Sequence, residues 1–563
     1  METTNLSKIR RDKMLNTINE IKKGITDEQT LTNLSMIENE LTKKKYGLIW
    51  EEHEERVDKE LETQIPTFED VKEKEIISNP DDKFNFLLEG DNLHSLYLLE
   101  KTHKEKIDVI YIDPPYNTGN KDFTYGDEQL SKEDEFKHSK WLSFMERRLK
   151  FAKDLLNDRG IIFISIDDNE QSELKLLCND IFGENNFVSN LHWKKKKQPS
   201  YLHGQVAGIM EYILVYAKDR NKLDKLSLSS PTDSNTRVDN ATNQVSERII
   251  KKGIRVKLDS SIKIIKKGIY KNKTMQTEFL NDVIIKNGRT CNDFKAKAQF
   301  RDSQERIDLF CKEDVLFITK NYGFRRDKLQ IELEKKKAIT DLILDWGDNQ
   351  DSDKELRNIF GGKVFDYPKP TMLIKNIIKS TDYKNSIILD FFAGSGTTAQ
   401  AVLELNKEDS GNRHFILCTN NENKICENIT YQRIKTVITG IRKDNSKYSD
   451  GIPTNLKYYK CTYIPRINTE NENLHNNLLI NIKNLIQLEN GIEIDDKKIR
   501  VYLDEDELDI FSKNQNELDI CEKVYISSDI LLTQAQEKIF KNNNVEVYII
   551  PEYYFEDEIM EVM

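Results

Sequence analysis

An apolar run that ends abruptly in an acid and two prolines constrains this chain more than any other feature. Residues 109–112 (Val-Ile-Tyr-Ile) are typical of a strand buried on both faces, because β-branched and aromatic residues follow one another without polar alternation. The tetrapeptide Asp113-Pro114-Pro115-Tyr116 comes next, and proline cannot continue a hydrogen-bonded ladder. The chain must therefore leave the sheet at the carboxyl end of this strand, where open α/β sheets keep their sites.

The side chains at this turn suit a planar aromatic amine. Asp113 and the Pro114 carbonyl offer acceptors for the two hydrogens of an exocyclic amino group. Tyr116 offers a ring that stacks on the heterocycle carrying that group. An ordinary turn that caps a strand would explain an isolated match of four residues equally well, so the interpretation needs a second motif.

A second apolar strand runs into a glycine-rich turn. Residues 387–390 lead into Phe391-Phe392-Ala393-Gly394-Ser395-Gly396, and a helical pattern follows. Glycines at a strand-to-helix turn let a ligand approach the backbone closely. Neither phosphate-binding fingerprint fits, because Ala399 replaces the third glycine of G-x-G-x-x-G and no G-x-x-x-x-G-K-[ST] occurs. The turn therefore predicts a nucleoside ligand without a pyrophosphate.

Together, D-P-P-Y and the later F-x-G-x-G (Phe392, Gly394, Gly396) resemble the S-adenosylmethionine-dependent amino-methyltransferases of DNA. The order of the two motifs resembles the β class of these enzymes. Longer phrases are most similar to the modification (Mod) subunit of type III restriction-modification systems. These phrases are Gly90-Asp91-Asn92 and residues 113–119, 365–370 and 390–398, and the resemblance covers roughly residues 86–440.

The resemblance implies a fold and a set of site residues. The fold is α/β, with a doubly wound, mostly parallel, Rossmann-like methyltransferase sheet in which the order of the motifs is circularly permuted. The implied catalytic residues are Asp113, Pro114, Pro115 and Tyr116. The implied cofactor contacts are Asp91, Lys369, Pro370, Asp390, Phe392, Gly394, Gly396, Thr397 and Glu422. A helix cap is the alternative interpretation of Asp91. The family places an acid directly after the strand at 414–418, where this chain has Thr419-Asn420-Asn421-Glu422, so either Glu422 or an asparagine takes the place of that acid.

Composition and element patterns divide the chain into five predicted regions. Residues 1–80 form a helical hairpin and a linker, and residues 81–217 form the catalytic half of the methyltransferase core. Residues 346–454 form its cofactor half, and residues 455–563 form a small α/β accessory domain. Residues 218–345, which are rich in serine, asparagine and lysine, resemble by their position an inserted target-recognition domain.

The net charge of -11 does not favour DNA binding by the whole surface, so phosphate contacts must be concentrated locally. The phrase Ile-Ile-Lys-Lys-Gly-Ile occurs twice, at residues 249–254 and 264–269, and a lysine run follows the predicted strand at 187–193. A solvated surface is the alternative explanation of such runs. The predicted DNA contacts are Lys194, Lys195, Lys196, Lys197, Tyr201, Lys251, Lys252, Lys266, Lys267, Arg325 and Arg326.

Several classes of site and location are not expected. Seven scattered cysteines without a C-x-x-C pair argue against a zinc site and a disulfide framework, and methyl transfer from a sulfonium needs no metal. No run of eighteen apolar residues and no secretory segment occurs, which predicts a cytoplasmic protein without membrane contact. The resemblance implies double-stranded DNA, a second copy in a homodimer and a restriction (Res) helicase-nuclease subunit as partners.

The predicted function is sequence-specific methylation of DNA at adenine N6, on a base flipped out of the duplex. Two alternatives stay open. Cytosine N4 is also an exocyclic amine and would fit the same acceptors, and the chain could serve mainly as the DNA-recognition subunit of a nuclease partner. The recognition sequence does not follow from the chain, because assigning side chains to bases needs the docked geometry.

Overall fold

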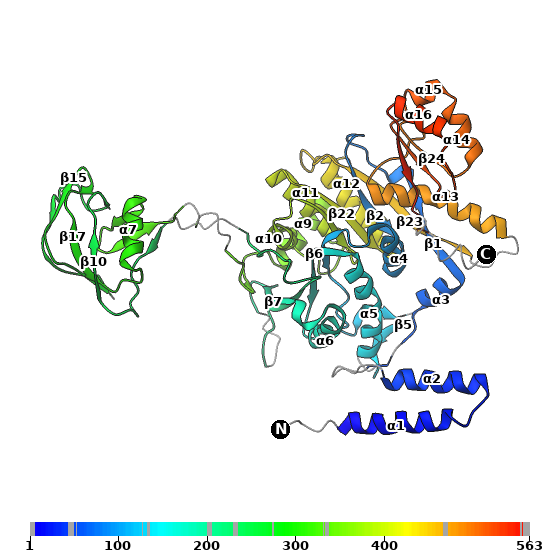
Figure 1. Cartoon of the computed structure of the whole chain (residues 1–563), viewed down its shortest axis with the longest axis horizontal. Coiled ribbons are helices and arrows are strands. Elements are labelled where there is room, and N and C mark those ends of the chain that lie inside the picture. The colour runs from blue at the N-terminus through cyan, green and yellow to red at the C-terminus, as the bar shows by residue number, and fades with distance from the viewer. Residues whose placement is uncertain are drawn as a thin grey trace. The chain divides into compact units, whose positions relative to one another are not determined.

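The computed structural model describes residues 6–42, 50–51, 53–125, 128–131, 135–199, 205–228, 235–272, 275–329, 332, 337–465, 471–551 and 554. The chain divides into two compact units (Figure 1). Unit 1 comprises Met1–Leu223, Asp341–Lys375 and Lys384–Met563, and unit 2 comprises Asp224–Thr340 and Asn376–Tyr383. The limits at 218 and 345 that the sequence predicts for an inserted domain lie close to those of unit 2.

Unit 1 is built on a ten-stranded sheet of order β1-β23-β2-β22-β21-β3-β6-β8-β7-β20. In that order the strands are Gln64–Asp70, Asn455–Pro465, Phe84–Glu89, Asn412–Thr419, Asn385–Asp390, Ile107–Ile112, Leu156–Ile166, Met210–Ala217, Phe187–Lys194 and Leu342–Ile343. Strands β2, β22, β21, β3 and β6 are parallel, and β8 lies antiparallel between β6 and β7. The mostly parallel sheet predicted from the sequence is confirmed.

The two sequence motifs meet because β21 pairs directly with β3. Ile388 lies opposite Val109 and Leu389 opposite Ile110, and all four side chains are fully buried. Since the two strands are parallel, their carboxyl ends lie at the same edge of the sheet. The acid-proline turn after β3 and the glycine-rich turn after β21 therefore open side by side, although they are far apart in the chain.

Helices pack on the sheet in two groups. One group shares a core with the sheet and consists of α4 (Asn92–His103), α5 (Lys137–Leu155), α6 (Gln171–Phe182) and α13 (Asn471–Asn490). In the other, α11 (Thr397–Asp409) packs against β22 and α12 (Tyr431–Thr439). Helix α3 (Arg56–Thr63) contacts β1 and α4. Helices α9 (Asn349–Phe360) and α10 (Thr371–Thr381) precede β21 in the chain.

The two ends of the chain carry small elements. Helices α1 (Leu6–Lys22) and α2 (Glu28–Thr42) form a hairpin, and Lys22 Nζ lies 2.6 Å from Glu38 Oε2. Strands β24 (Ile499–Tyr502), β25 (Lys523–Ile526) and β26 (Glu546–Ile549) form a parallel sheet with α14 (Glu505–Ser512), α15 (Gln515–Leu518) and α16 (Gln534–Asn542). Strands β1 and β23, however, belong to the main sheet, so this sheet extends beyond the predicted core limits of 81 and 454.

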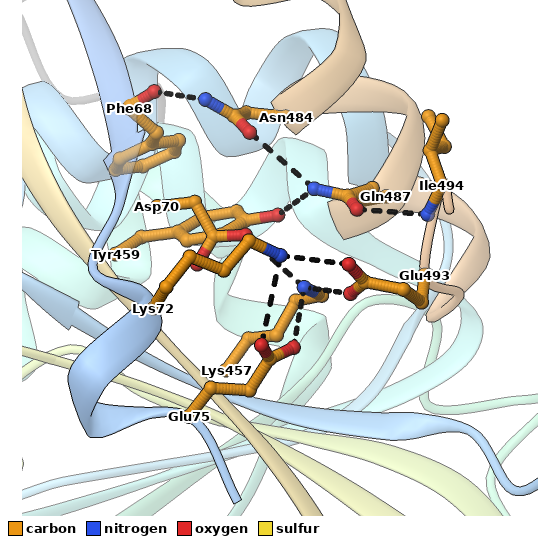
Figure 2. A network of polar contacts seen from close by, with 10 residues as sticks. All are labelled: Phe68, Asp70, Lys72, Glu75, Lys457, Tyr459, Asn484, Gln487, Glu493 and Ile494. Atoms are coloured by element: carbon orange, nitrogen blue, oxygen red, sulfur yellow. Dashed lines mark hydrogen bonds and ion pairs between the residues drawn. The ribbon is translucent and has the colours of Figure 1, made fainter. Parts of the chain in front are cut away.

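A buried network of charges ties β1 to β23 and to the chain after α13 (Figure 2). The Lys457 side chain is fully buried, and its Nζ lies 3.1 Å from Asp70 Oδ2 and 2.7 Å from Glu75 Oε1. Glu493 contacts both Lys457 and Lys72, the latter at 2.7 Å. Removing one partner of a buried ion pair leaves an uncompensated charge. The network therefore fixes where the C-terminal part joins the sheet.

Unit 2 repeats one strand plan twice. Its first sheet has the order β10-β17-β14-β13, and the second begins β12-β15-β16-β11. The second sheet continues with β18 (Leu316–Ile318), β19 (Phe324–Asp327) and β9 (Asn235–Arg237). Exchanging β10 with β12, β11 with β13, β14 with β16 and β15 with β17 converts the first order into the start of the second. The eight strands, from β10 to β17, are Ser246–Ile250, Arg255–Val256, Ile264–Ile265, Gly268–Asn272, Met275–Phe279, Val283–Lys286, Arg289–Thr290 and Phe294–Ala298.

The duplicated phrase of the sequence occupies matching places in this repeat. In the first copy, Lys251 Nζ lies 3.3 Å from Asp293, whose other oxygen accepts from the next backbone N–H at 2.8 Å. In the second copy, Lys266 Nζ lies 3.0 Å from Asp282, which accepts from the next N–H at 2.7 Å. Unit 2 is thus an internal two-fold repeat.

Candidate active site

Asp113, directly after β3, is the centre of a cluster of polar side chains. Lys369 Nζ lies 2.7 Å from its Oδ1 and 2.8 Å from its Oδ2. The Tyr116 hydroxyl lies 2.9 Å from Asp113 Oδ1 and accepts from Lys369 Nζ at 2.8 Å. Glu211 Oε2 lies 3.3 Å from the Tyr116 hydroxyl, and Lys195 Nζ donates to Glu211 Oε1 at 3.0 Å. Two carboxylates and two ammonium groups therefore face one another at the edge where β3 ends.

Burial sets the charge state of this cluster. It raises the pKa of the Asp113 carboxyl above its ordinary value, although Lys369 acts against this shift. Burial alone would lower the pKa of Lys369, but Asp113 and Glu211 raise it above its ordinary value. Burial also raises the pKa of Tyr116 well above its ordinary value, and both carboxylates add to the effect. At neutral pH Tyr116 is therefore neutral and Lys369 charged, and an entering amine competes with Lys369 for the oxygens of Asp113.

The glycine-rich turn after β21 needs glycine for two reasons. Gly394 and Gly396 have φ angles of +47° and +76°, in the left-handed region that a β-carbon disfavours. At Gly396 a β-carbon would also lie 3.2 Å from Thr430 Cγ2. The Thr430 hydroxyl donates to the Gly394 carbonyl at 2.6 Å. The close approach of η4 (Cys426–Thr430) thus fixes the shape of the turn.

Asp390, the last residue of β21, holds the start of this turn. Its Oδ1 accepts from the Phe392 N–H at 3.0 Å, and its Oδ2 accepts from the Thr398 hydroxyl at 2.5 Å. Burial raises the pKa of Asp390 to about 7. The ring of Phe392 is half-buried against Phe144, with centroids 5.9 Å apart.

A buried arginine of α12 makes hydrogen bonds to residues of the glycine-rich turn and of α11. The Arg433 side chain is fully buried, and its Nη1 lies 2.7 Å from Thr397 Oγ1 and 3.1 Å from Ser395 Oγ. Its Nε donates to Gln400 at 2.8 Å and its Nη2 to Thr371 at 3.0 Å. Burial lowers the pKa of Arg433 to about 10, so the group stays charged at neutral pH. The hydroxyl of Thr397, a predicted cofactor contact, is therefore engaged within the protein.

The other predicted cofactor contacts lie in different surroundings. Asp91 caps α4, since its Oδ1 accepts from the Leu93 N–H at 2.8 Å, and its side chain remains 36% exposed. Glu422 is exposed at the start of η3 (Glu422–Lys424). Pro370 packs against Gly347. Lys369 has its ammonium group on Asp113, so the structure brings this predicted cofactor contact together with the catalytic tetrapeptide.

The lysine run after β7 is divided among different surroundings. Lys195 joins the Asp113 cluster through Glu211, and Lys197 Nζ lies 3.3 Å from Asp348 and 3.2 Å from Asp351. Lys194 and Lys196 are half-buried. Tyr201 lies outside the residues that the structure describes.

The predicted DNA contacts of unit 2 lie in different surroundings. Lys251, Lys252, Lys266 and Lys267 are all exposed, and Lys251 and Lys266 are ion-paired as described above. Strand β19 (Phe324–Asp327) places Arg325 outward and Arg326 inward, because successive side chains of a strand point to opposite faces. Arg326 is 3% exposed and its guanidinium pairs with Glu332 at 2.5 Å, so it faces the interior and not a ligand.

Three residues that matter here were not singled out from the sequence. Glu211 is the one acid in the otherwise uncharged β8 segment Met210–Ala217, and that position was a usable signal. Trp141 donates from Nε1 to the Pro115 carbonyl at 2.7 Å, and its helical spacing showed only that it is buried. Arg433 had no signal, since a helix with one arginine is ordinary.

The described part of the chain holds no group of three or more His, Cys, Asp or Glu side chains arranged to bind a metal. Within that part, every helix is also too short or too polar to cross a membrane.

Comparison with known proteins shows which proteins this chain is similar to. The family model N6_N4_Mtase, described as DNA methylase, matches residues 107–432, which include both turns. The chain is 35% identical to the type III restriction-modification enzyme StyLTI Mod subunit of Salmonella typhimurium over 69% of this chain and 62% of that protein. It is 32% identical to the EcoPI Mod subunit of Escherichia phage P1, over 70% of this chain and 66% of that one. The aligned part thus falls short of two thirds of the length of these Mod subunits.

A type II methyltransferase, M.KpnI of Klebsiella pneumoniae, is 33% identical over 67% of this chain and 90% of its own length. Among solved structures, the cytosine-N4-specific PvuII DNA methyltransferase is 12% identical with a TM-score of 0.33, over 63% of this chain and 94% of that chain.

Proposed function

This chain belongs to the N6_N4_Mtase family of DNA methylases, and from that premise we propose that it transfers the methyl group of S-adenosylmethionine to adenine N6 in double-stranded DNA. The observation that carries the proposal is the Asp113 carboxylate at the end of β3, beside the glycine-rich turn that ends β21. An acceptor for an aromatic amine and a turn suited to a nucleoside open at one edge of one sheet.

The residues at this edge fit the cofactor. Gly394 and Gly396 carry no side chain that would keep a nucleoside from the backbone. Asp91, whose side chain is partly exposed after β2, suits the hydroxyl or amino groups of an adenosine, and the half-buried ring of Phe392 offers an apolar contact. When bound here, S-adenosylmethionine would supply an electrophilic methyl group on its sulfonium.

Asp113 and the Pro114 carbonyl would act on the target amine. The lone pair of adenine N6 is delocalised into the ring, so the nitrogen is a poor nucleophile. If both of its hydrogens are accepted by the protein, the nitrogen becomes tetrahedral and its lone pair is freed for attack. The Asp113 carboxylate would then accept the proton that leaves the methylated nitrogen.

The supporting contacts keep these groups in place. Trp141 fixes the Pro115 carbonyl, and the hydroxyl contacts of Tyr116 fix the ring on which the base would stack. A paired base cannot reach such a pocket, so the target must flip out of the duplex at a cost of a few kcal/mol.

Lys369 must yield when the amine enters. Its Nζ occupies both oxygens of Asp113, and Glu211 Oε2 lies 3.7 Å from it as a second partner. Before the base arrives, Lys369 favours the ionised form of Asp113. When the base arrives, a small shift of the ammonium group toward Glu211 frees the acceptor.

The finer assignments rest on the relatives. Similarity to two Mod subunits supports a role as the Mod subunit of a type III system. A cytoplasmic homodimer that works with a Res helicase-nuclease partner is part of the same proposal. Unit 2 is proposed as the target-recognition domain, in which the exposed Lys252 and Lys267 contact phosphates.

Exchanging Asp113 for alanine tests the assignment of the acceptor. The variant and the wild type are incubated with tritiated S-adenosylmethionine and DNA that is unmethylated at adenine. Transfer is expected to be lost in Asp113→Ala while cofactor affinity, measured by calorimetry, changes by less than about twofold. Transfer at the wild-type rate would place the chemistry elsewhere.

A further inference from the structure

The catalytic loop is held from behind by a buried amide. Asn117, just after the D-P-P-Y tetrapeptide, is 1% exposed and has a left-handed φ of +56°. Its Nδ2 donates to the Lys137 carbonyl at 3.1 Å and to Glu170 Oε1 at 2.5 Å. Asparagine tolerates this backbone conformation better than most residues. The two hydrogen bonds of its side chain hold the loop in place where the loop leaves the site.

The carboxyl that holds Asn117 is itself deeply buried. Glu170 lies four residues after β6 and is 0% exposed. His138 Nδ1, on α5, lies 2.7 Å from the same Oε1. Within the described residues, Glu170 Oε2 and Asn117 Oδ1 are buried without a hydrogen-bond partner. Burying a carboxyl with an unsatisfied oxygen costs stability, so stability alone does not account for it.

The ordinary explanation for an acid at this position does not hold. Glu170 is the N-cap residue of α6, where a side-chain oxygen commonly accepts from the first N–H groups of the helix. Its side chain makes no such capping bond and turns toward Asn117 instead. The contact of the Glu170 side chain with Asn117 therefore replaces the usual role of an N-cap side chain.

We propose that Glu170 is a positioning residue, which acts through Asn117 to hold the Asp113–Asn117 loop in the geometry that accepts the target amine. The inference rests on the proposed methyl transfer. With Trp141 on the Pro115 carbonyl, the loop has one fixed point within the tetrapeptide and one just after it. Misplacement of reacting groups by about 1 Å costs on the order of 100-fold in rate.

The protonation state of Glu170 decides which variant mimics it. Burial, together with the charges of Glu173 and Asp167, raises the pKa of Glu170 to about 8, although Asn117 and Lys137 act against this shift. Burial lowers the pKa of His138 below its ordinary value. At neutral pH Glu170 is therefore mostly protonated, and glutamine, which keeps an acceptor oxygen, is a close replacement.

Variants at position 170 separate positioning from folding. Glu170→Ala is expected to lower the single-turnover methylation rate by roughly 10- to 100-fold. Glu170→Gln is expected to stay within about threefold of wild type. Glu173→Gln, which removes one negative charge from the first turn of the same helix, is the control and should match wild type. Equal rates in Glu170→Ala and wild type, or equal losses in Glu170→Ala and Glu170→Gln, would overturn the inference.

A swap of donor and acceptor covers the case in which Glu170→Ala does not fold. Asn117→Asp removes the amide donor that holds Glu170 and the Lys137 carbonyl, so the rate should fall. Adding Glu170→Gln supplies an amide donor again and should recover part of the loss. Losses that simply add in the double variant would contradict a direct contact between the two side chains.

Hydrogen exchange distinguishes failure of this inference from failure of the proposed function. Peptides that cover residues 113–119 should exchange faster in Glu170→Ala than in wild type, whether or not the protein methylates DNA. If wild type transfers no methyl group, the proposed function fails, and the exchange rates still show whether Glu170 holds the loop through Asn117. If the exchange rate and the methylation rate are both unchanged in Glu170→Ala, the proposed methyl transfer stands and the positioning role of Glu170 is refuted.

Discussion

Replacing Lys369 by methionine removes the ammonium group from the centre of the site while keeping an aliphatic chain of similar length. Lys369 makes two charge-assisted hydrogen bonds to Asp113, at 2.7 and 2.8 Å. Each such bond is worth about 1.5–3 kcal/mol when buried. The Asp113 side chain is 26% exposed, so solvent recovers part of this, and about 2 kcal/mol in favour of the ionised carboxylate is a reasonable net value.

The sign of the effect on activity follows from the acceptor role of Asp113. Lys369 opposes the upward shift that burial imposes on the pKa of Asp113, so its loss raises that pKa further. Only the ionised carboxylate accepts freely from the target amine. On the acid limb of the rate profile, Lys369→Met should therefore be about 30-fold slower than wild type, which is 2 kcal/mol at about 1.4 kcal/mol per factor of ten. The loss should shrink as the pH rises.

The assay is single-turnover methylation between pH 6 and 9, with the cofactor KM measured alongside. Lys375→Met is a matched control, because Lys375 Nζ also lies between two carboxylates, 3.3 Å from Glu404 and 2.5 Å from Glu408, and contacts neither Asp113 nor Tyr116. The control should keep the wild-type acid limb. A Lys369→Met profile that keeps the wild-type acid limb, with a raised KM for S-adenosylmethionine, would refute this reasoning and make Lys369 a cofactor contact.

Three further outcomes are expected. Arg433→Met leaves the polar groups under the glycine-rich turn without a donor, so S-adenosylmethionine affinity should fall at least tenfold by calorimetry; unchanged affinity would show that the turn keeps its shape unaided. The pKa of Glu170 is about 8 in the folded state and about 4.3 in the unfolded state, so between these pH values the folded state binds a proton that the unfolded state has released. The free energy of unfolding of the wild type therefore falls as the pH rises through this window. The thermal stability of Glu170→Gln relative to wild type should therefore increase from pH 5 to pH 8, and a constant difference would contradict the shift. Removing the exposed Lys252 and Lys267 should reduce the salt dependence of DNA binding by about two phosphate contacts, more than removing the paired Lys251 and Lys266.

The sequence was informative where local chemistry decides the structure. The strand that stops at Asp113, the glycine-rich turn before α11 and the hairpin of α1 and α2 each follow from residues next to one another. It was less informative where distant segments meet. Glu211 reaches the site because β8 runs antiparallel to β6, and so its start lies at the edge where β3 ends. Only the paired sheet determines that arrangement.

Charge patterns needed the structure as well. The sequence does not distinguish Arg325 from Arg326. In the strand, Arg325 points outward, whereas Arg326 points inward and pairs with Glu332. Lys197 belongs to a basic run, yet two aspartates from the segment around α9 neutralise it. Lys369 showed the same effect in the site, since its position in a cofactor-flanking phrase did not reveal a contact with Asp113.

The most direct test of the central proposal is the identity of the methylated base. The chain is incubated with tritiated S-adenosylmethionine and DNA unmethylated at adenine, and the DNA is then digested to nucleosides and separated. Label in N6-methyladenine is the predicted result. Label in N4-methylcytosine would keep the Asp113 acceptor but contradict the assigned base, and bound cofactor without any label in DNA would contradict methyl transfer by this chain alone.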